Sequence, residues 1–369
     1  MTQGTVLTAA HKQWANRPAD ERVASLDELY RRAREMRDRC KEKDVAFGEL
    51  RVEALNDDIV LTRGQTPAKL TNWSFSQLCG RVGAPATYLQ DLPTTLAVNN
   101  LNYGLSVRSK SEEGRETARL LFEQNGVLNL RALTTDIYER FWNVEIAERL
   151  LGLKAQGWEP ARPDFNKQVD DFPALYLGDR DMFAFIRLPN IHLAQPVKSR
   201  IGDSAPIYRG LIVSNSEVGA KKLRYMRFFY NGMCGNHLIW GATDVRELEA
   251  RHVGNIRNKV KAFDIQIKEY AAESLIEDEA IIKKAAKKII AATKEEVLDT
   301  LFGKRSLNLT RKTLEAGYDA VVEEQDGNPG TVWGMVQGLT RYSQTIQYAD
   351  KRTEVDAAAG KLMDMVDAF

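Results

Sequence analysis

Apolar and polar residues alternate over several short stretches in the middle of the chain, as in strands with one buried face. The clearest case is a hairpin of residues 117–123 and 127–133, because an Asn-Gly pair at 125–126 is a strong signal for a tight turn. A second hairpin is predicted from residues 173–177 and 182–188, whose second strand has one wholly apolar face. These patterns predict antiparallel strand pairs.

Three further strands are predicted between Tyr208 and Trp240. The first is rich in aliphatic residues and ends at the polar residues 215–219. The second runs over residues 222–230 and ends at another Asn-Gly pair, and a short third strand follows. Three consecutive strands joined by short turns predict an antiparallel meander.

Apolar residues at helical spacing dominate the two ends of the chain. They predict helices over residues 19–43, 71–82 and 137–151, and almost every segment after Trp240 has the same periodicity. The predicted C-terminal helices span residues 244–273, 277–292, 294–302, 309–317, 331–347 and 355–369. The predicted fold class is therefore α+β, with an antiparallel sheet built from hairpins and a β-meander, N-terminal helices and a largely helical C-terminal region.

A chain of 369 residues is longer than one hydrophobic core usually supports, so more than one domain is expected. We expect an N-terminal helical region with short strands over residues 1–114. A central antiparallel β region with one helix is expected over residues 115–242, and a C-terminal helical region over residues 243–369.

Composition narrows the class of protein. The net charge of +1 argues against binding nucleic acid with the whole surface, although a local patch is compatible with it. Cys40, Cys79 and Cys234 are widely separated and odd in number, which is typical of reduced thiols in a cytosolic protein. No apolar run reaches the roughly 18 residues needed to cross a bilayer. We therefore expect a cytoplasmic protein without membrane contact.

Sequence motifs for catalysis are missing or incomplete. Cys234 and His237 have the spacing of a metal-binding pair, but a structural zinc site needs a second pair, and the other histidines do not supply one. Neither a phosphate-binding glycine loop nor a G-x-S-x-G nucleophile motif occurs. Carboxylate pairs such as Asp179 and Asp181 are more typical of solvated turns than of Mg²⁺ sites. We predict no catalytic residue, no metal and no cofactor.

One segment differs from the rest of the chain in charge. Between Arg180 and Tyr230 there are nine basic residues and three acidic ones, a local charge of about +6. Cationic side chains that follow phosphates and aromatic rings that stack on bases hold single-stranded nucleic acid, at about 1 to 3 kcal/mol per stacked base. The candidate phosphate-binding residues are Arg180, Arg187, Lys221, Lys222, Arg224 and Arg227, and the candidate stacking residues are Tyr225 and Phe229.

A second interpretation of this segment stays open. Lys222 and Arg224 share one strand face, whereas Tyr225 and Arg227 share the other, so cations and aromatic rings are not sorted onto separate faces. The aromatic residues would then be core, and the charges would lie at strand ends.

Four segments of the chain resemble a known family. They read LTNWSFSQLCGRVGAPATYL from residue 70, RALTTDIYERFWNVEI from 131, RGLIVSNSEVGAKKLRYMRFFYNGMCGNHLIWG from 209 and TVWGMVQGLTRYSQ from 331. Together they resemble the phage and plasmid-like proteins grouped as the domain of unknown function DUF932. The resemblance covers roughly residues 70–348 and is most specific in the third segment. It implies a mobile-element origin, and it implies no set of catalytic residues.

The order of three strands followed by a long helix is similar in outline to the core of single-strand annealing proteins of phages, which is an analogy at the level of fold. We expect a phage or plasmid accessory protein that binds single-stranded DNA and promotes strand annealing in recombination or replication, as a homo-oligomer. Two alternatives stay open: an interaction protein that sequesters or inhibits a host defence factor, and a metal-dependent enzyme acting on nucleic acid.

Overall fold

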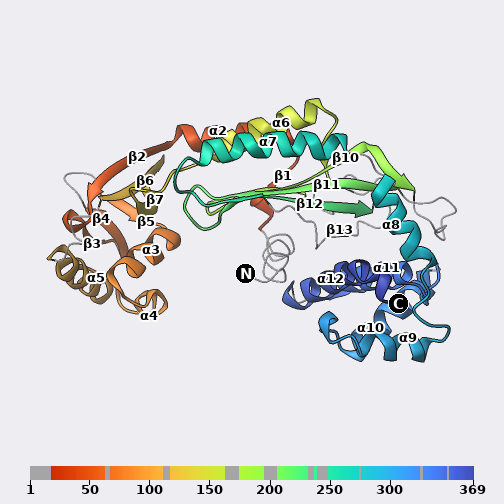
Figure 1. Cartoon of the computed structure of the whole chain (residues 1–369). Coiled ribbons are helices and arrows are strands. Elements are labelled where there is room, and N and C mark those ends of the chain that lie inside the picture. The colour runs from red at the N-terminus through yellow and green to blue at the C-terminus, as the bar shows by residue number, and fades with distance from the viewer. Residues whose placement is uncertain are drawn as a thin grey trace.

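The protein has an α+β fold in which helices flank two β-sheets, as the computed structural model shows (Figure 1). The structure describes residues 18–62, 67–110, 117–162, 174–194, 206–231, 237–238, 248–273, 276–324, 327–346 and 349–369. These residues form an N-terminal lobe with its own sheet, a central sheet covered by helices on one face, and a C-terminal helical lobe. The predicted fold class is confirmed.

The N-terminal lobe is a six-stranded mixed sheet against which helices pack. The strand order is β2-β6-β7-β5-β4-β3, and all neighbours are antiparallel except β5 and β7. Its elements are β2 (Cys40–Ala46), β3 (Arg51–Leu55), β4 (Asp58–Thr62), β5 (Ala68–Leu70), α3 (Asn72–Val82), α4 (Ala86–Gln90), α5 (Thr94–Ser109), β6 (Thr117–Asn125) and β7 (Val127–Thr135). Leu78 of α3 and Leu101 of α5 are fully buried in its core beside Leu120 of β6.

The predicted hairpin over residues 117–133 is confirmed as β6 and β7, with Gly126 at a φ of 71° in the turn. Its strands pair with β2 and β5 and not with the central sheet. The domain boundary expected after residue 114 therefore falls between strands of one sheet.

The central sheet is antiparallel, with the order β1-β9-β10-β11-β12-β13; β8 also pairs with β10, and β14 with β12. Its strands are β1 (Arg22–Val23), β8 (Glu159–Pro160), β9 (Leu175–Leu177), β10 (Met182–Ala194), β11 (Pro206–Asn215), β12 (Leu223–Asn231), β13 (His237–Leu238) and β14 (Leu248–Ala250). The second predicted hairpin corresponds to β9 and β10, and the predicted meander to β11, β12 and β13. Both are confirmed.

Three helices cover one face of the central sheet: α2 (Leu26–Asp38), α6 (Asn143–Ala155) and α7 (Ile256–Ala272) (Figure 1). Leu29, Leu150 and Val260 of these helices are buried in one core with Leu211 and Leu223 of the sheet. Helix α7 thus packs on the central sheet, although the sequence placed it in the C-terminal helical region.

The C-terminal lobe consists of α8 (Ile276–Lys287), α9 (Lys294–Phe302), α10 (Arg311–Glu324), α11 (Val332–Thr345) and α12 (Ala349–Asp364). These helices share a second core, in which Trp333 and Leu339 of α11 are buried. Thr331 caps α11 by accepting a hydrogen bond from the Gly334 amide at 3.1 Å. None of the described helices combines the length and the apolar composition needed to cross a membrane.

Two predicted helices are wrong at the ends that enter a sheet. The helix predicted over residues 19–43 spans only Leu26–Asp38, because Arg22–Val23 form β1, which pairs with β9. The charged residues after Asp38 form β2, which pairs with β6 from Cys40 opposite Glu123 to Ala46 opposite Thr117. The helix predicted over residues 137–151 begins only at Asn143, because the preceding residues cross from the N-terminal lobe to the central sheet. In both places pairing between distant segments overrides the local pattern.

The helix predicted over residues 244–273 is also wrong in its first part. Leu248–Ala250 form β14, and Gly254 and Asn255 then adopt the left-handed backbone conformation, with φ of 56° and 53°. A helix cannot continue through such residues, so α7 begins at Ile256.

The crossing of α10 and α11 depends on Gly338, because a Cβ atom built there would lie 2.0 Å from the backbone oxygen of Gly317. We expect Gly338→Ala to push the helices apart and to lower the free energy of unfolding by about 1 to 3 kcal/mol or more, as overpacking does. Urea unfolding followed by circular dichroism measures the change.

Gly80→Ala is the matched control for this substitution. A Cβ atom at Gly80 of α3 meets no atom within 4 Å, so alanine should stabilise the helix by about 0.5 to 1 kcal/mol. A Gly338→Ala variant as stable as the parent protein would contradict the close helix crossing.

Candidate nucleic-acid interface and the polar junction beneath it

Four of the candidate phosphate-binding residues meet at one end of the central sheet, which we call the basic end. The β9–β10 turn lies beside the β11–β12 turn there, because Met182 at the start of β10 pairs with Asn215 at the end of β11. The four residues come from these turns and from the start of β12; they are Arg180, Lys221, Lys222 and Arg224. Folding therefore gathers cations that the sequence separates by more than forty positions.

Three of these cations have carboxylate partners. The Lys221 Nζ lies 2.7 Å from an Asp181 carboxylate oxygen. Lys222 and Arg224 both pair with Glu249 of β14, with a distance of 3.4 Å for Arg224, which confirms that they share a strand face. The three basic side chains are 18–31% exposed. Partly exposed ion pairs contribute about 0 to 1 kcal/mol, so Glu249 holds Lys222 and Arg224 weakly, whereas the Asp181 carboxylate that pairs with Lys221 is buried.

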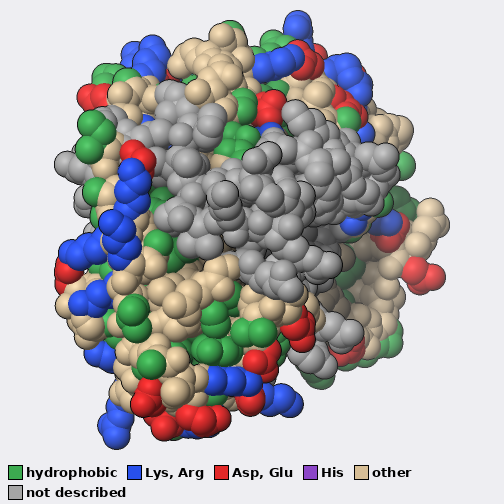
Figure 2. All heavy atoms as spheres, turned by 90° about the vertical axis from the view of Figure 1, so that its right-hand side faces the viewer, with side chains coloured by type: hydrophobic (Ala, Val, Ile, Leu, Met, Phe, Trp, Pro, Cys, Tyr) green, Lys and Arg blue, Asp and Glu red, His purple; other side chains and the backbone are tan. Residues whose placement is uncertain are grey.

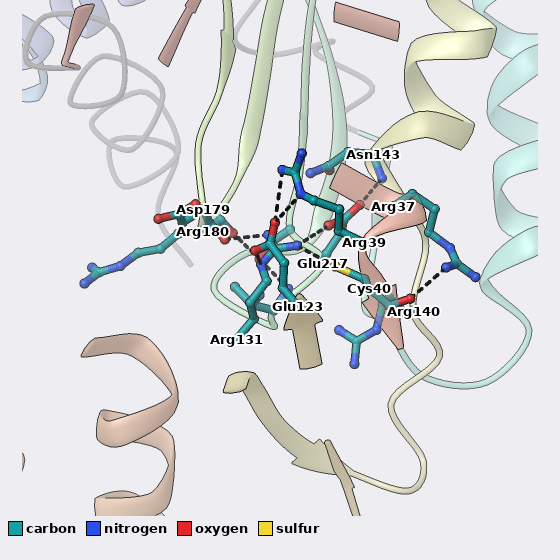
Figure 3. Close-up of polar contacts among 12 residues, drawn as sticks. Arg37, Arg39, Cys40, Glu123, Arg131, Arg140, Asn143, Asp179, Arg180 and Glu217 are labelled. Atoms are coloured by element: carbon teal, nitrogen blue, oxygen red, sulfur yellow. Dashed lines mark hydrogen bonds and ion pairs between the residues drawn. The ribbon is translucent and has the colours of Figure 1, made fainter. Parts of the chain in front are cut away.

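Arg180 is the most open of the four residues, and its guanidinium lies 5.4 Å from the centre of the Trp73 ring. Figure 3 shows its side chain directed away from the polar cluster beside it. A guanidinium stacked on an aromatic ring keeps its full charge and its hydrogen-bond donors.

The two other candidate arginines do not lie at the basic end. Arg187 is 1% exposed in the middle of β10, where it pairs with Glu159 at 2.7 Å and lies over the ring of Tyr208. Arg227 lies further along β12 and pairs with Glu273 at 3.1 Å. Neither residue faces the four cations at the basic end.

The two candidate stacking residues are buried in hydrophobic cores. Tyr225 lies under α7 and contacts the ring of Phe263 edge to face at 5.5 Å. Phe229 belongs to the core of the C-terminal lobe. In this conformation neither ring has an exposed face for a base, which agrees with the second interpretation of the segment.

A largely buried polar cluster, which we call the junction, lies beside Asp179 and Arg180 of the basic end (Figure 3). It consists of Arg39, Cys40, Glu123, Arg131 and Glu217. Glu217, in the turn after β11, is 1% exposed, and its carboxylate lies 3.3 Å from Nη1 of Arg131 in β7. Its other oxygen accepts a hydrogen bond from the amide of Asn143 at 2.8 Å, at the N-terminus of α6.

Arg131 extends these contacts to three further groups. It lies 3.5 Å from Glu123 on the neighbouring strand β6, and it donates to the Cys40 sulfur at 3.3 Å. It also donates to the backbone oxygen of Asp179 at 3.0 Å, in the β9–β10 turn. One buried guanidinium thus links the N-terminal lobe with both turns of the basic end.

The β11–β12 turn is fixed by side chains from the N-terminal lobe as well. Trp73 and Gln77 of α3 both donate to the backbone oxygen of Val218, at 2.8 and 2.9 Å, and the Tyr138 hydroxyl donates to the backbone oxygen of Ser216 at 2.9 Å. Gly219 has a φ of 80°, a conformation that favours glycine. These hydrogen bonds hold the backbone of the turn in one conformation.

The junction offers little chemical reactivity. Burial raises the pKa of the Cys40 thiol, although the neighbouring Arg131 opposes this shift. A thiol with a raised pKa is a poor nucleophile at neutral pH. In the part of the chain that the structure describes, no three His, Cys, Asp or Glu side chains are grouped as metal ligands. The junction is best understood as a support for the basic end.

The meander and the helices that follow it belong to an α+β fold that one known protein family covers. The family model described as "Domain of unknown function (DUF932)" matches residues 174–362, about half of the chain, and the chain belongs to this family. The match runs from the start of β9 into α12, and the N-terminal lobe lies outside it. No curated protein and no solved structure matches the chain.

Sequence reasoning missed the partners of the candidate residues and the junction. The third resembling segment contained Glu217, but nothing in its local pattern indicates that this carboxylate is buried against Arg131, 86 positions earlier. Three of the partner carboxylates, those of Glu159, Glu249 and Glu273, lie outside the segment from Arg180 to Tyr230 that the charge count covered.

Removing Glu217 should destabilise the protein strongly. We expect Glu217→Ala to lower the free energy of unfolding by about 3 to 5 kcal/mol, because Arg131 then keeps a buried charge with one partner fewer. Urea unfolding measures the loss. Glu249→Ala is the control, since this carboxylate is 25% exposed and its removal should change the same quantity by about 1 kcal/mol or less. Equal effects of the two substitutions would contradict the role of the junction.

The stability of the protein should also depend on the protonation of His252. Its ring stacks on Tyr138 at 5.1 Å, and burial lowers its pKa from 6.5 to about 4. A depressed pKa means that the unfolded chain takes up the proton first. The stability that depends on a neutral His252 is therefore fully present above about pH 6.5. As the pH falls from 6.5 towards about 4, the free energy of unfolding should decrease by up to about 3 kcal/mol.

The His252→Phe variant, which retains an aromatic ring beside Tyr138, isolates this contribution. The difference in unfolding free energy between parent and variant should change between pH 6.5 and 4 and be constant above pH 6.5. A difference that does not depend on pH would contradict the buried neutral state of His252.

Proposed function

We propose that the protein binds single-stranded DNA at the basic end of the central sheet. The observation that carries this proposal is the convergence of Arg180, Lys221, Lys222 and Arg224 from two adjacent turns and one strand. Cations at the end of a sheet can contact successive phosphates of a flexible strand, and such contacts require no base recognition. Trp73, half-buried under the Arg180 guanidinium, places an aromatic ring beside them.

The ion pairs at the basic end are compatible with exchange of partners. The side chains of Lys222, Arg224 and Glu249 are all partly exposed, so water already screens their attraction. A phosphate can therefore replace the carboxylate at low ionic strength. Elsewhere basic and acidic side chains are mixed, as on the described part of the face in Figure 2, which is expected for a net charge of +1.

The proposal includes a phage or plasmid origin and a place in the cytoplasm of the host cell. The resemblance of the four segments to phage and plasmid-like proteins supports the origin, and the three widely separated cysteines support a reducing compartment. We also propose that the protein forms a homo-oligomer and promotes the annealing of complementary strands. Energy transfer between labelled complementary strands, with and without the protein, tests annealing directly.

Binding is measured by the fluorescence anisotropy of a labelled oligothymidine. Affinity should fall steeply between about 50 and 200 mM salt, because each phosphate contact releases counterions. The Lys222→Ala, Arg224→Ala double variant should bind more weakly. Its plot of log binding constant against log salt concentration should also be shallower, by about one unit of slope per lost phosphate contact. Glu249→Gln should act in the opposite direction, because it removes a repelling carboxylate and releases both cations.

The Lys283→Ala, Lys284→Ala double variant is the matched control. Both lysines lie on α8 in the C-terminal lobe and also pair with carboxylates, so the variant removes the same charge from another part of the protein. Its affinity should remain close to that of the parent protein. Absence of binding at low salt would overturn the proposed function, and an equal loss in both double variants would overturn the proposed location.

A further inference from the structure

A cavity of about 250 Å³ lies between α6 and α7, above strand β12. Its wall combines apolar side chains with a few polar and charged ones. The lining residues are Arg149, Leu150, Gly152, Leu153, Gln156, Tyr225, Asp264, Ile267 and Lys268. This combination of an apolar wall with a small number of polar groups is typical of sites for small molecules.

The floor of the cavity contains a buried hydroxyl group without a partner. Tyr225 is 2% exposed, and its hydroxyl oxygen has no hydrogen-bond partner among the residues that the structure describes. Burial raises the pKa of Tyr225, and the charges that also act on it are those of Asp264 and Arg149, both of which line the cavity. The hydroxyl therefore remains protonated and lies just beneath the surface of the polar part of the cavity.

Gly152 keeps the space between the helices open. It lies inside α6, where glycine costs about 0.5 to 1 kcal/mol relative to alanine. A Cβ atom built at Gly152 meets no atom within 4 Å, so close packing does not require glycine here. Because the exposed Gly152 lies at the rim of the cavity, a larger side chain at this position would narrow its opening.

The charges around the cavity favour an anion. Arg149 pairs with Asp264 at 3.3 Å, and this pair leaves the charge of the exposed Lys268 as an excess positive charge among the lining residues. An incoming carboxylate or phosphate would lie between two cations and one carboxylate. Leu150, Leu153 and Ile267 would contact the apolar part of the same molecule.

We infer that this cavity binds a small organic anion, a carboxylate or a phosphate ester with an apolar body. Its volume corresponds to roughly eight water molecules, which limits the ligand to about eight to twelve non-hydrogen atoms. Arg149 and Lys268 bind the anionic group, and the Tyr225 hydroxyl donates to a second acceptor atom. This site lies on the helix-covered face of β12, so the inference does not depend on DNA binding at the basic end.

Four compounds of similar size test the inference in the full-length protein: benzoate, phenyl phosphate, benzyl alcohol and benzylamine. Saturation-transfer NMR detects binding, and titration gives the dissociation constants. At least one of the two anions should bind about tenfold or more tightly than the alcohol and the amine, the difference expected for one charge-assisted contact. The comparison of benzoate with phenyl phosphate identifies the preferred anionic group.

Three variants locate the binding site. Gly152→Leu should abolish binding by narrowing the opening of the cavity, whereas Ala155→Leu, which adds the same side chain at an exposed position of α6 outside the lining, should leave it unchanged. Lys268→Gln, on the protein surface, should weaken anion binding without affecting the fold. Tyr225→Phe should weaken it about five- to tenfold, the loss of one hydrogen bond.

Several outcomes would overturn the inference. Absence of binding by every compound at millimolar concentration would show that the cavity holds only water. Equal affinity for benzoate and benzyl alcohol would exclude an anion site, and unchanged binding by folded Gly152→Leu or Lys268→Gln protein would place the compounds elsewhere. None of these outcomes would bear on oligothymidine binding.

Discussion

The carboxylate of Glu217 is bound from two sides by groups that belong to different parts of the fold. Arg131 reaches it from the sheet of the N-terminal lobe, and the amide of Asn143 reaches it from the first residue of the helix that covers the central sheet. Because the carboxylate is 1% exposed, water cannot replace either partner at low cost. The relative positions of β7, α6 and the β11–β12 turn are therefore coupled through a single buried charge.

This coupling extends to the surface. The turn that contains Glu217 continues directly into Lys221 and Lys222, and its backbone accepts hydrogen bonds from Trp73 and Gln77 of the N-terminal lobe. The flexible cations of the basic end are thus attached to a backbone that the N-terminal lobe already holds in place, which would favour the binding that we propose. Less conformational entropy is lost when phosphates bind to such a backbone. The junction fixes the backbone of the turn, and the cations on that turn keep partly exposed side chains.

Local patterns were sufficient for the hairpin and meander strands, but not for β2 and β14 or for the partners of any strand. The Asn-Gly pair at 125–126 specified a hairpin, and a period of two correctly placed Lys222 and Arg224 on one strand face. The sheet to which that hairpin belongs depends on pairing with β2, whose charged residues have no strand pattern of their own. The environment of a cation depends in the same way on a distant carboxylate such as Glu249. Hydrophobic periodicity predicts the type of a single helix or strand. A contact depends on two segments, so the pattern of either one alone cannot predict it.

Strand β12 shows why cations and aromatic rings in one segment need not form one site. Adjacent residues of a strand point to opposite faces, so Arg224 lies beside Glu249 at the basic end while Tyr225 points beneath α7. Arg224 and Tyr225 are therefore separated in space although they are adjacent in sequence, whereas Arg227 shares the face of Tyr225 and lies over the ring of Tyr270 in α7. The exposed face carries the groups that can meet a polyanion, and the covered face carries a hydroxyl that water reaches poorly. Two anionic ligands of very different size could be bound along one strand without sharing a side chain.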